Sequence, residues 1–182
     1  ICKNIQLVSP SVWAWRQKRT KFIKKFIDLT LCLFHFEHEF YKKINHKSIH
    51  LGHPFYTIEK ATKKDIFDKY SLDHNKKYIS ILPGSRDSEL KYMLPTYIKF
   101  IKNYSIINPE TVYLIPASSY KLCNKIHKMT KSLCNVVVKP FAVNEFLSIS
   151  EFSLVTSGTA SLESAVIGCP PIICYKTNPV NY

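Results

Sequence analysis

One segment of this chain combines residue types that suit a phosphate. Gly84, Ser85 and Arg86 follow an apolar, strand-like run over residues 78–82 and precede a helical pattern. The N–H groups at a helix start are unpaired and carry partial positive charge, and a guanidinium adds a forked pair of hydrogen bonds. The segment therefore predicts a phosphate or diphosphate site. An ordinary strand–turn–helix with a surface arginine remains the competing interpretation.

A second segment repeats the same arrangement. An apolar run over residues 152–155 leads to Ser157, Gly158 and Thr159, and a helical pattern follows. Gly158 permits close approach of a phosphate, while Glu163, about one turn into the helix, is suited to accept hydrogen bonds from sugar hydroxyls. Simple helix capping and a surface acid at the helix start are the alternatives. Two such segments together favour a sugar nucleotide as the ligand.

Arginine is rare in this chain. Of 26 Lys and Arg residues only Arg16, Arg19 and Arg86 are arginine. Lysine serves where charge alone is needed, whereas a planar fork requires arginine. Trp13 and Trp15 stand beside Arg16, and this cluster is the more specific signal of a site near the start of the chain. Such a cluster suits a membrane surface or an anionic substrate.

A basic helix is expected after this cluster. Residues 22–27 carry two phenylalanines and two isoleucines at helical spacing, lysines occupy the other faces, and no acidic residue occurs before Asp28. One interpretation is an amphipathic element near a membrane surface or an anionic substrate. The favoured interpretation is a helix that packs on a sheet and leaves its lysine face in solvent.

The overall charge is +13, which favours anionic partners. A basic nucleic-acid-binding domain is the non-enzyme alternative, but the cations are spread along the whole chain rather than gathered with stacking aromatics, so no nucleic-acid partner is expected. Five histidines crowd residues 35–53 without a zinc-like spacing, so no metal is expected. The six cysteines suggest reduced thiols, and no apolar run approaches the roughly 18 residues of a membrane span.

The elements that must position these residues alternate regularly. We expect strands at 78–82, 112–115, 136–138, 152–155 and 171–174, with helices at 89–104, 120–131, 144–148 and 159–167. Such alternation predicts an α/β fold with a parallel sheet, and it brings the loops after the strands to one edge. Earlier strands are expected at 5–8, 29–34 and 48–51. The domain assignment is 1–54, a linker at 55–77, and 78–182.

Five motifs in this order resemble one enzyme family. They are Ser9-Pro10-Ser11-Val12-Trp13-Ala14-Trp15-Arg16, Phe36-Glu37 with Phe40-Tyr41, Gly52-His53-Pro54, Leu82-Pro83-Gly84-Ser85-Arg86 with Glu89, and Ser157-Gly158-Thr159-Ala160 with Leu162-Glu163. Together they resemble the lipid-A-disaccharide synthases, glycosyltransferases of family 19 and GT-B type. The match covers nearly the whole chain, and the tryptophan–arginine cluster distinguishes it from other nucleotide-sugar enzymes.

The resemblance implies a fold and a reaction. It implies two Rossmann-like halves with parallel sheets, the first half incomplete in this chain. The implied enzyme joins UDP-2,3-diacylglucosamine to 2,3-diacylglucosamine 1-phosphate with inversion, releasing UDP and needing no metal or cofactor. It works in Gram-negative lipid A synthesis as a peripheral protein on the cytoplasmic face of the inner membrane, and a homodimer is left open. By carry-over, the UDP site comprises Gly84, Ser85, Arg86, Glu89, Ser157, Gly158, Thr159 and Glu163. The acceptor or membrane side is assigned Trp13, Trp15, Arg16 and Arg19.

The chain also departs from the family pattern. The aspartate proposed as catalytic base would lie before Ile1, so no catalytic residue is assigned, and the glycine-rich donor loop and the segments expected after Tyr182 are absent. His35 stands where the family usually has proline. We therefore expect an internal fragment that is inactive alone. Another UDP-sugar GT-B transferase or a UDP-GlcNAc epimerase is the enzyme alternative; acyl-chain preference cannot be inferred.

Overall fold

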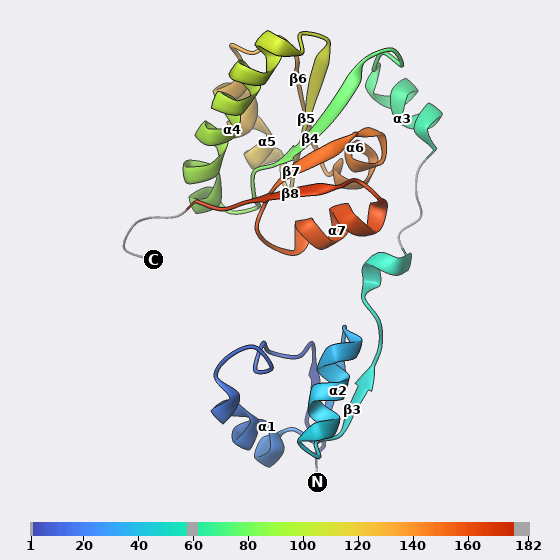
Figure 1. Cartoon of the computed structure of the whole chain (residues 1–182), viewed down its shortest axis with the longest axis vertical. Coiled ribbons are helices and arrows are strands. Elements are labelled where there is room, and N and C mark those ends of the chain that lie inside the picture. The colour runs from blue at the N-terminus through green and yellow to red at the C-terminus, as the bar shows by residue number, and fades with distance from the viewer. Residues whose placement is uncertain (1, 58–61, 177–182) are drawn as a thin grey trace. The chain divides into compact units, whose positions relative to one another are not determined.

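The computed structural model describes residues 2–57 and 62–176, and its contacts divide the chain into two units, Ile1–Ile58 and Glu59–Tyr182. Both units are α/β structures built on parallel sheets (Figure 1), which confirms the predicted fold class. Within the described residues, no helix is both long enough and apolar enough to cross a membrane.

The first unit has a three-stranded parallel sheet in the order β1-β2-β3. Its elements are β1 (Ile5–Leu7), η1 (Gln17–Arg19), α1 (Thr20–Phe26), β2 (Leu29–Cys32), α2 (His35–Lys43), β3 (Ser48–His50) and η2 (Pro54–Thr57). Val12, Ile23, Cys32 and Tyr41 form its buried core. The core thus ties the loop before η1 and the helix after it to the sheet.

Helix α1 packs on the core and leaves its lysines in solvent, as favoured from its sequence, but its two phenylalanines are exposed as well. Ile23 is buried at 4% exposure, but Phe22 and Phe26 are 63% and 45% exposed, and their ring centroids lie 4.5 Å apart. A seven-residue helix turns only one narrow face to the core, and Ile23 occupies it. The two phenylalanines therefore join the lysines on the exposed side of α1.

The second unit has a five-stranded parallel sheet in the order β6-β5-β4-β7-β8. Its strands are β4 (Lys77–Leu82), β5 (Thr111–Ala117), β6 (Val136–Pro140), β7 (Phe152–Thr156) and β8 (Pro171–Cys174), and its helices are α3 (Lys63–Tyr70), α4 (Asp87–Ile107), α5 (Tyr120–Thr130), α6 (Val143–Ile149) and α7 (Thr159–Ile167). The chain runs outward from β4 to β6 and returns to β7 on the other side of β4. The order of strands therefore reverses between β4 and β7, which is where ligands bind in open sheets.

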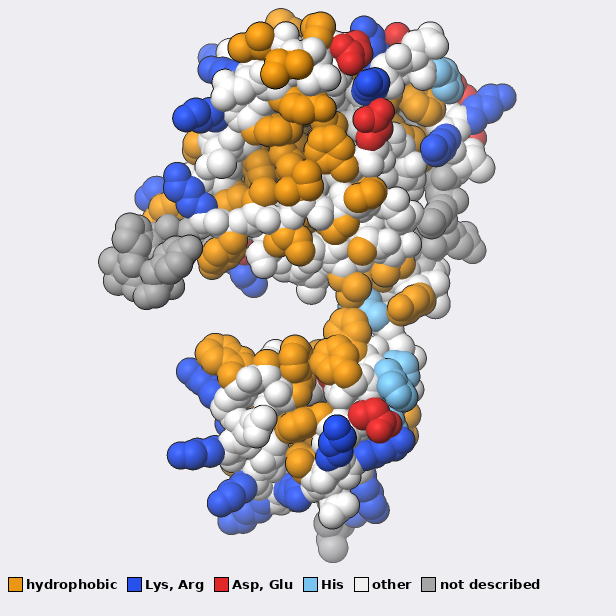
Figure 2. All heavy atoms as spheres, viewed as in Figure 1, with side chains coloured by type: hydrophobic (Ala, Val, Ile, Leu, Met, Phe, Trp, Pro, Cys, Tyr) orange, Lys and Arg blue, Asp and Glu red, His pale blue; other side chains and the backbone are white. Residues whose placement is uncertain are grey.

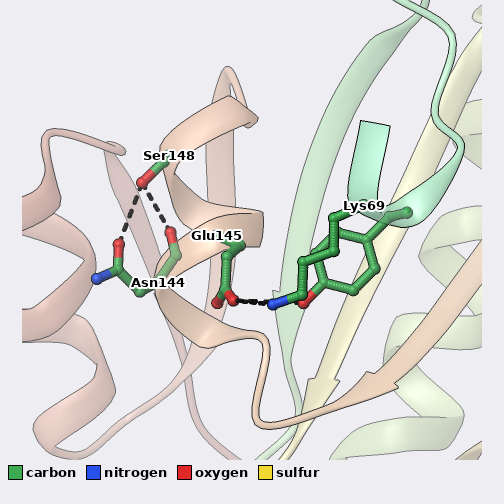
Figure 3. A network of polar contacts seen from close by, with 5 residues as sticks. Lys69, Asn144, Glu145 and Ser148 are labelled. Carbon is green, nitrogen blue, oxygen red and sulfur yellow. Dashed lines mark hydrogen bonds and ion pairs between the residues drawn. The ribbon is translucent and has the colours of Figure 1, made fainter. Parts of the chain in front are cut away.

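Helix α3 lies inside the segment assigned to the linker, residues 55–77, and belongs to the second unit. Ile66 is 1% exposed, and Phe67 and Tyr70 pack against the core beneath α6. At its end, the Nζ of Lys69 lies 2.8 Å from Oε1 of Glu145 on α6, as Figure 3 shows. Burial of apolar side chains fixes α3, and the partly exposed ion pair adds little.

Candidate functional site

A cavity of about 420 Å³ opens at the carboxyl ends of β4 and β7. Both predicted segments contribute to its wall. The lining residues are Leu82, Pro83, Gly84, Ser85, Arg86, Glu89, Pro116, Ser118, Val143, Thr156, Ser157, Gly158, Thr159, Ala160 and Glu163. The structure thus brings together all eight residues assigned to the nucleotide. It adds residues from the ends of β5 and β7 and from α6 that the sequence analysis missed; Ser118 was detectable, because it follows a strand at the same sheet edge.

The loop after β4 is organised around the carboxylate of Glu89. Its Oε2 accepts hydrogen bonds from the backbone N–H groups of Ser85, at 2.9 Å, and Arg86, at 3.2 Å. Its Oε1 lies 2.9 Å from Nη1 of Arg86. Gly84 has φ +102, and an added Cβ would lie 2.7 Å from the Cβ of Glu89. The loop can therefore close over Glu89 only with glycine at this position.

This geometry changes what the first loop can offer an anion. The amides of Ser85 and Arg86, which the sequence analysis offered to a phosphate, already donate to Glu89. The guanidinium of Arg86 uses one of its nitrogens on Glu89 while its side chain remains 78% exposed. Since a guanidinium has five N–H donors, several remain for a ligand. The first loop thus presents a tethered guanidinium at the cavity.

The loop after β7 presents backbone amides instead. Helix α7 begins at Thr159 after Gly158, and no side chain caps it, so neither Ser157 nor Thr159 plays the capping role considered from sequence. The N–H of Ser157 donates to the carbonyl of Cys174 at 2.9 Å. Gly158, Thr159 and Ala160 line the cavity at the positive end of the helix. First-turn N–H groups have no partner within their own helix, so this end of the cavity suits a phosphate.

Glu163 lies in the cavity wall one turn into α7. Burial raises the pKa of its carboxyl above the ordinary value of 4.5. Among the described residues it accepts no hydrogen bond and forms no ion pair. A half-buried carboxyl without a partner is costly unless a ligand supplies donors, which fits the predicted contact with sugar hydroxyls.

One buried contact connects the two loops. The hydroxyl groups of Tyr97 on α4 and Thr156 at the end of β7 lie 3.2 Å apart. Tyr97 is 1% exposed, and burial raises the pKa of its phenol far above the usual range. Tyr97 thus stays neutral, and its hydrogen bond to Thr156 fixes α4 against the strand that carries the second loop.

The four residues assigned to the acceptor or membrane side lie in the first unit. Trp15, Arg16 and Arg19 line a smaller cavity of about 170 Å³. Trp13 does not line it; its ring meets Phe36 edge-on at a centroid distance of 4.8 Å. In the part of the chain that the structure describes, no group of three or more His, Cys, Asp or Glu could hold a metal ion.

Comparison with protein families gives a match over residues 2–182 to the model described as lipid-A-disaccharide synthetase. The chain belongs to this family. Lipid-A-disaccharide synthase 2 of Legionella pneumophila (strain Lens) is 32% identical over 96% of this chain and 46% of its own length. Lipid-A-disaccharide synthase of Colwellia psychrerythraea is 34% identical over 99% of this chain and 47% of its own. The chain therefore spans about half the length of the curated relatives it matches.

Solved structures agree on the fold. The Staphylococcus aureus MnaA–UDP structure matches with a TM-score of 0.56 at 17% identity, over 91% of this chain and 47% of that one. TarM matches with a TM-score of 0.53 at 14% identity, over 100% of this chain and 38% of that one. At such identities the likeness shows the fold alone. The chain thus has part of a GT-B fold.

Proposed function

We propose that this chain is the nucleotide-sugar-binding part of a glycosyltransferase that joins UDP-2,3-diacylglucosamine to 2,3-diacylglucosamine 1-phosphate, with inversion and release of UDP. Family membership over residues 2–182 supports the reaction class. The observation that carries the ligand assignment is the single cavity that both loops line where the strand order reverses. There a guanidinium and open helix amides face one space, as a diphosphate requires.

Each wall of the cavity has a role in this proposal. The first-turn amides of α7 hold the diphosphate, and Arg86 stabilises the negative charge that grows on it as UDP leaves. Glu163 accepts hydrogen bonds from the ribose hydroxyls. Glu89 acts through Arg86 and the loop rather than on the nucleotide, because its carboxylate is engaged by Ser85 and Arg86. No residue of the chain is assigned as catalytic base, so we propose that the chain alone is inactive.

The test is UDP binding measured by isothermal titration calorimetry. Arg86→Ala is expected to weaken binding by about 1.5–3 kcal/mol, the value of a hydrogen bond to a charged group. Lys91→Ala is the control, since Lys91 is an exposed cation on the same helix that does not line the cavity. Unchanged affinity in Arg86→Ala, or an equal loss in Lys91→Ala, would contradict the assignment.

We also propose that the protein works as a peripheral protein on the cytoplasmic face of the inner membrane. Support comes from the exposed side of α1, where Phe22 and Phe26 stand among lysines. Figure 2 shows Lys and Arg side chains around the part of the first unit that carries this helix. Aromatic rings beside cations suit the headgroup region of an anionic bilayer.

A further inference from the structure

The smaller cavity of the first unit has an unusual wall. It measures about 170 Å³, and its lining residues are Pro10, Ser11, Val12, Trp15, Arg16 and Arg19. Two of the three arginines in the chain therefore face one small space, although lysine supplies almost every other cation. Paired guanidinium groups bind a planar or tetrahedral oxyanion through forked hydrogen bonds that lysine cannot form.

No carboxylate among the described residues neutralises the two arginines. The first unit contains only three acidic residues, Asp28, Glu37 and Glu39, and each is already engaged. Asp28 accepts from the N–H of Asn4 and pairs with Lys3, Glu37 accepts from the N–H groups of Leu33 and Phe34, and Glu39 pairs with Lys42 and His35. Among the described residues, neither Arg16 nor Arg19 forms an ion pair. Their charge is therefore available to a bound anion.

The fold fixes the backbone that carries both arginines. Val12 precedes Arg16 and Ile23 follows Arg19, and both apolar side chains are buried in the same core cluster. Arg16 has the left-handed backbone conformation, with φ 57 and ψ 38, which residues with a Cβ seldom adopt. Its carbonyl accepts from the N–H of Arg19 at 2.9 Å. Such local strain is tolerated where the surroundings fix it, and it is common at ligand sites.

We propose that this cavity binds a phosphate monoester. Two guanidinium groups and the hydroxyl of Ser11 provide donors, and the volume suits a phosphate with part of the group that carries it. The guanidinium of Arg16 lies 5.1 Å from the ring centroid of Trp15, which orients it while leaving its edge to the ligand. Resting on the proposed function, the site would hold the phosphate of the acceptor sugar. The phosphodiester of a bilayer phospholipid is the competing oxyanion for the same two guanidinium groups.

The test uses fluorescence of the full chain. Trp13 and Trp15 are the only tryptophans, so Trp13→Phe leaves Trp15 as the sole indole reporter in the cavity. Glucosamine 1-phosphate is titrated while Trp15 emission is recorded, with glucosamine as the ligand that lacks phosphate. We expect saturable binding of glucosamine 1-phosphate and no binding of glucosamine. Arg16→Gln or Arg19→Gln should weaken the affinity for glucosamine 1-phosphate about tenfold or more, as for a lost charged hydrogen bond. Far-UV circular dichroism verifies that each variant is folded.

A matched control lies between the two arginines. Lys18 is an exposed cation of the same short helix η1 and does not line the cavity, so Lys18→Gln is expected to change the affinity less than about twofold. An equal loss in Lys18→Gln, or equal binding of glucosamine, would overturn the proposal. If Arg16→Gln weakens binding to phosphatidylglycerol vesicles more than it weakens binding of glucosamine 1-phosphate, the proposal is overturned in favour of a phospholipid ligand. UDP affinity is expected to stay unchanged in these variants, and failure of the chain to bind UDP would contradict only the nucleotide assignment.

Discussion

The loop after β4 offers a quantitative test of how the site is built. Gly84→Ala places a Cβ where the backbone has φ +102 and the Cβ of Glu89 lies 2.7 Å away. The positive φ alone costs about 1–2 kcal/mol. The Cβ must also displace the Glu89 carboxylate from the amides of Ser85 and Arg86, which costs about a further 1.5–3 kcal/mol. We therefore expect Gly84→Ala to lower the free energy of unfolding by about 2.5–5 kcal/mol.

A second background separates these two costs. In Glu89→Gly both the carboxylate and the Cβ that the new methyl group would meet are gone, so Gly84→Ala should then cost only the backbone strain of about 1–2 kcal/mol. The difference between the two backgrounds is the coupling energy, expected at about 1.5–3 kcal/mol. Urea unfolding followed by far-UV circular dichroism measures all four proteins. Equal costs of Gly84→Ala in both backgrounds would refute the reasoning that Glu89 organises this loop.

Two other perturbations test the second loop and the membrane face. Glu163→Gln is expected to weaken binding of UDP but not of pyrophosphate. Burial raises the pKa of Glu163, so the folded state favours the protonated carboxyl. The contribution of this carboxyl to the free energy of unfolding is therefore present below its ordinary pKa and is lost as the pH rises through its pKa in the folded protein. Glu163→Gln should accordingly stabilise the protein more at about pH 7 than at about pH 4. An equal loss of UDP and pyrophosphate affinity would contradict the role of Glu163. Phe22→Ser with Phe26→Ser is expected to reduce binding to phosphatidylglycerol vesicles by at least about tenfold. The control is Ile106→Ser with Ile107→Ser, two side chains of the second unit that are even more exposed; an equal loss in this control, or unaltered vesicle binding in the phenylalanine variant, would contradict the membrane role.

Much of the second unit is predictable from its sequence because burial there follows the repeating pattern. Strand β4 runs Lys77–Leu82 against an expected 78–82, and β7 runs Phe152–Thr156 against 152–155. Parallel strands are buried on both faces, so they appear as continuous apolar runs. Helix α4 is longer than expected, Asp87–Ile107 against 89–104. Its start was detectable, since an acid in the first turn and Glu89 at the third position are typical of a helix N-terminus.

The details of the site were less predictable because they depend on side-chain direction. The sequence places Glu89 beside Arg86, but only the fold shows that its carboxylate takes the loop amides. Likewise, helical spacing groups Phe22 with Ile23, but spacing cannot say which of them meets the core. Tyr97 and Thr156 are separated by 58 residues along the chain, so no local pattern indicates the contact that joins the two loops. The residue types of a local motif can be identified from the sequence, whereas contacts between distant segments can be identified only once the topology of the fold is known.

The distribution of cations gives one more test of the two sites. Among the described residues, lysines make most of the exposed ion pairs, as Lys69 and Lys125 do, while all three arginines line cavities, even though Arg86 also pairs with Glu89. If charge alone mattered at those cavities, lysine would serve there too. Arg86→Lys should therefore lose most of the UDP affinity that Arg86→Ala loses, and Arg16→Lys should behave like Arg16→Gln toward glucosamine 1-phosphate. Calorimetry and Trp15 fluorescence measure these affinities, and lysine variants that bind as tightly as the original protein would show that both cavities need only a positive charge.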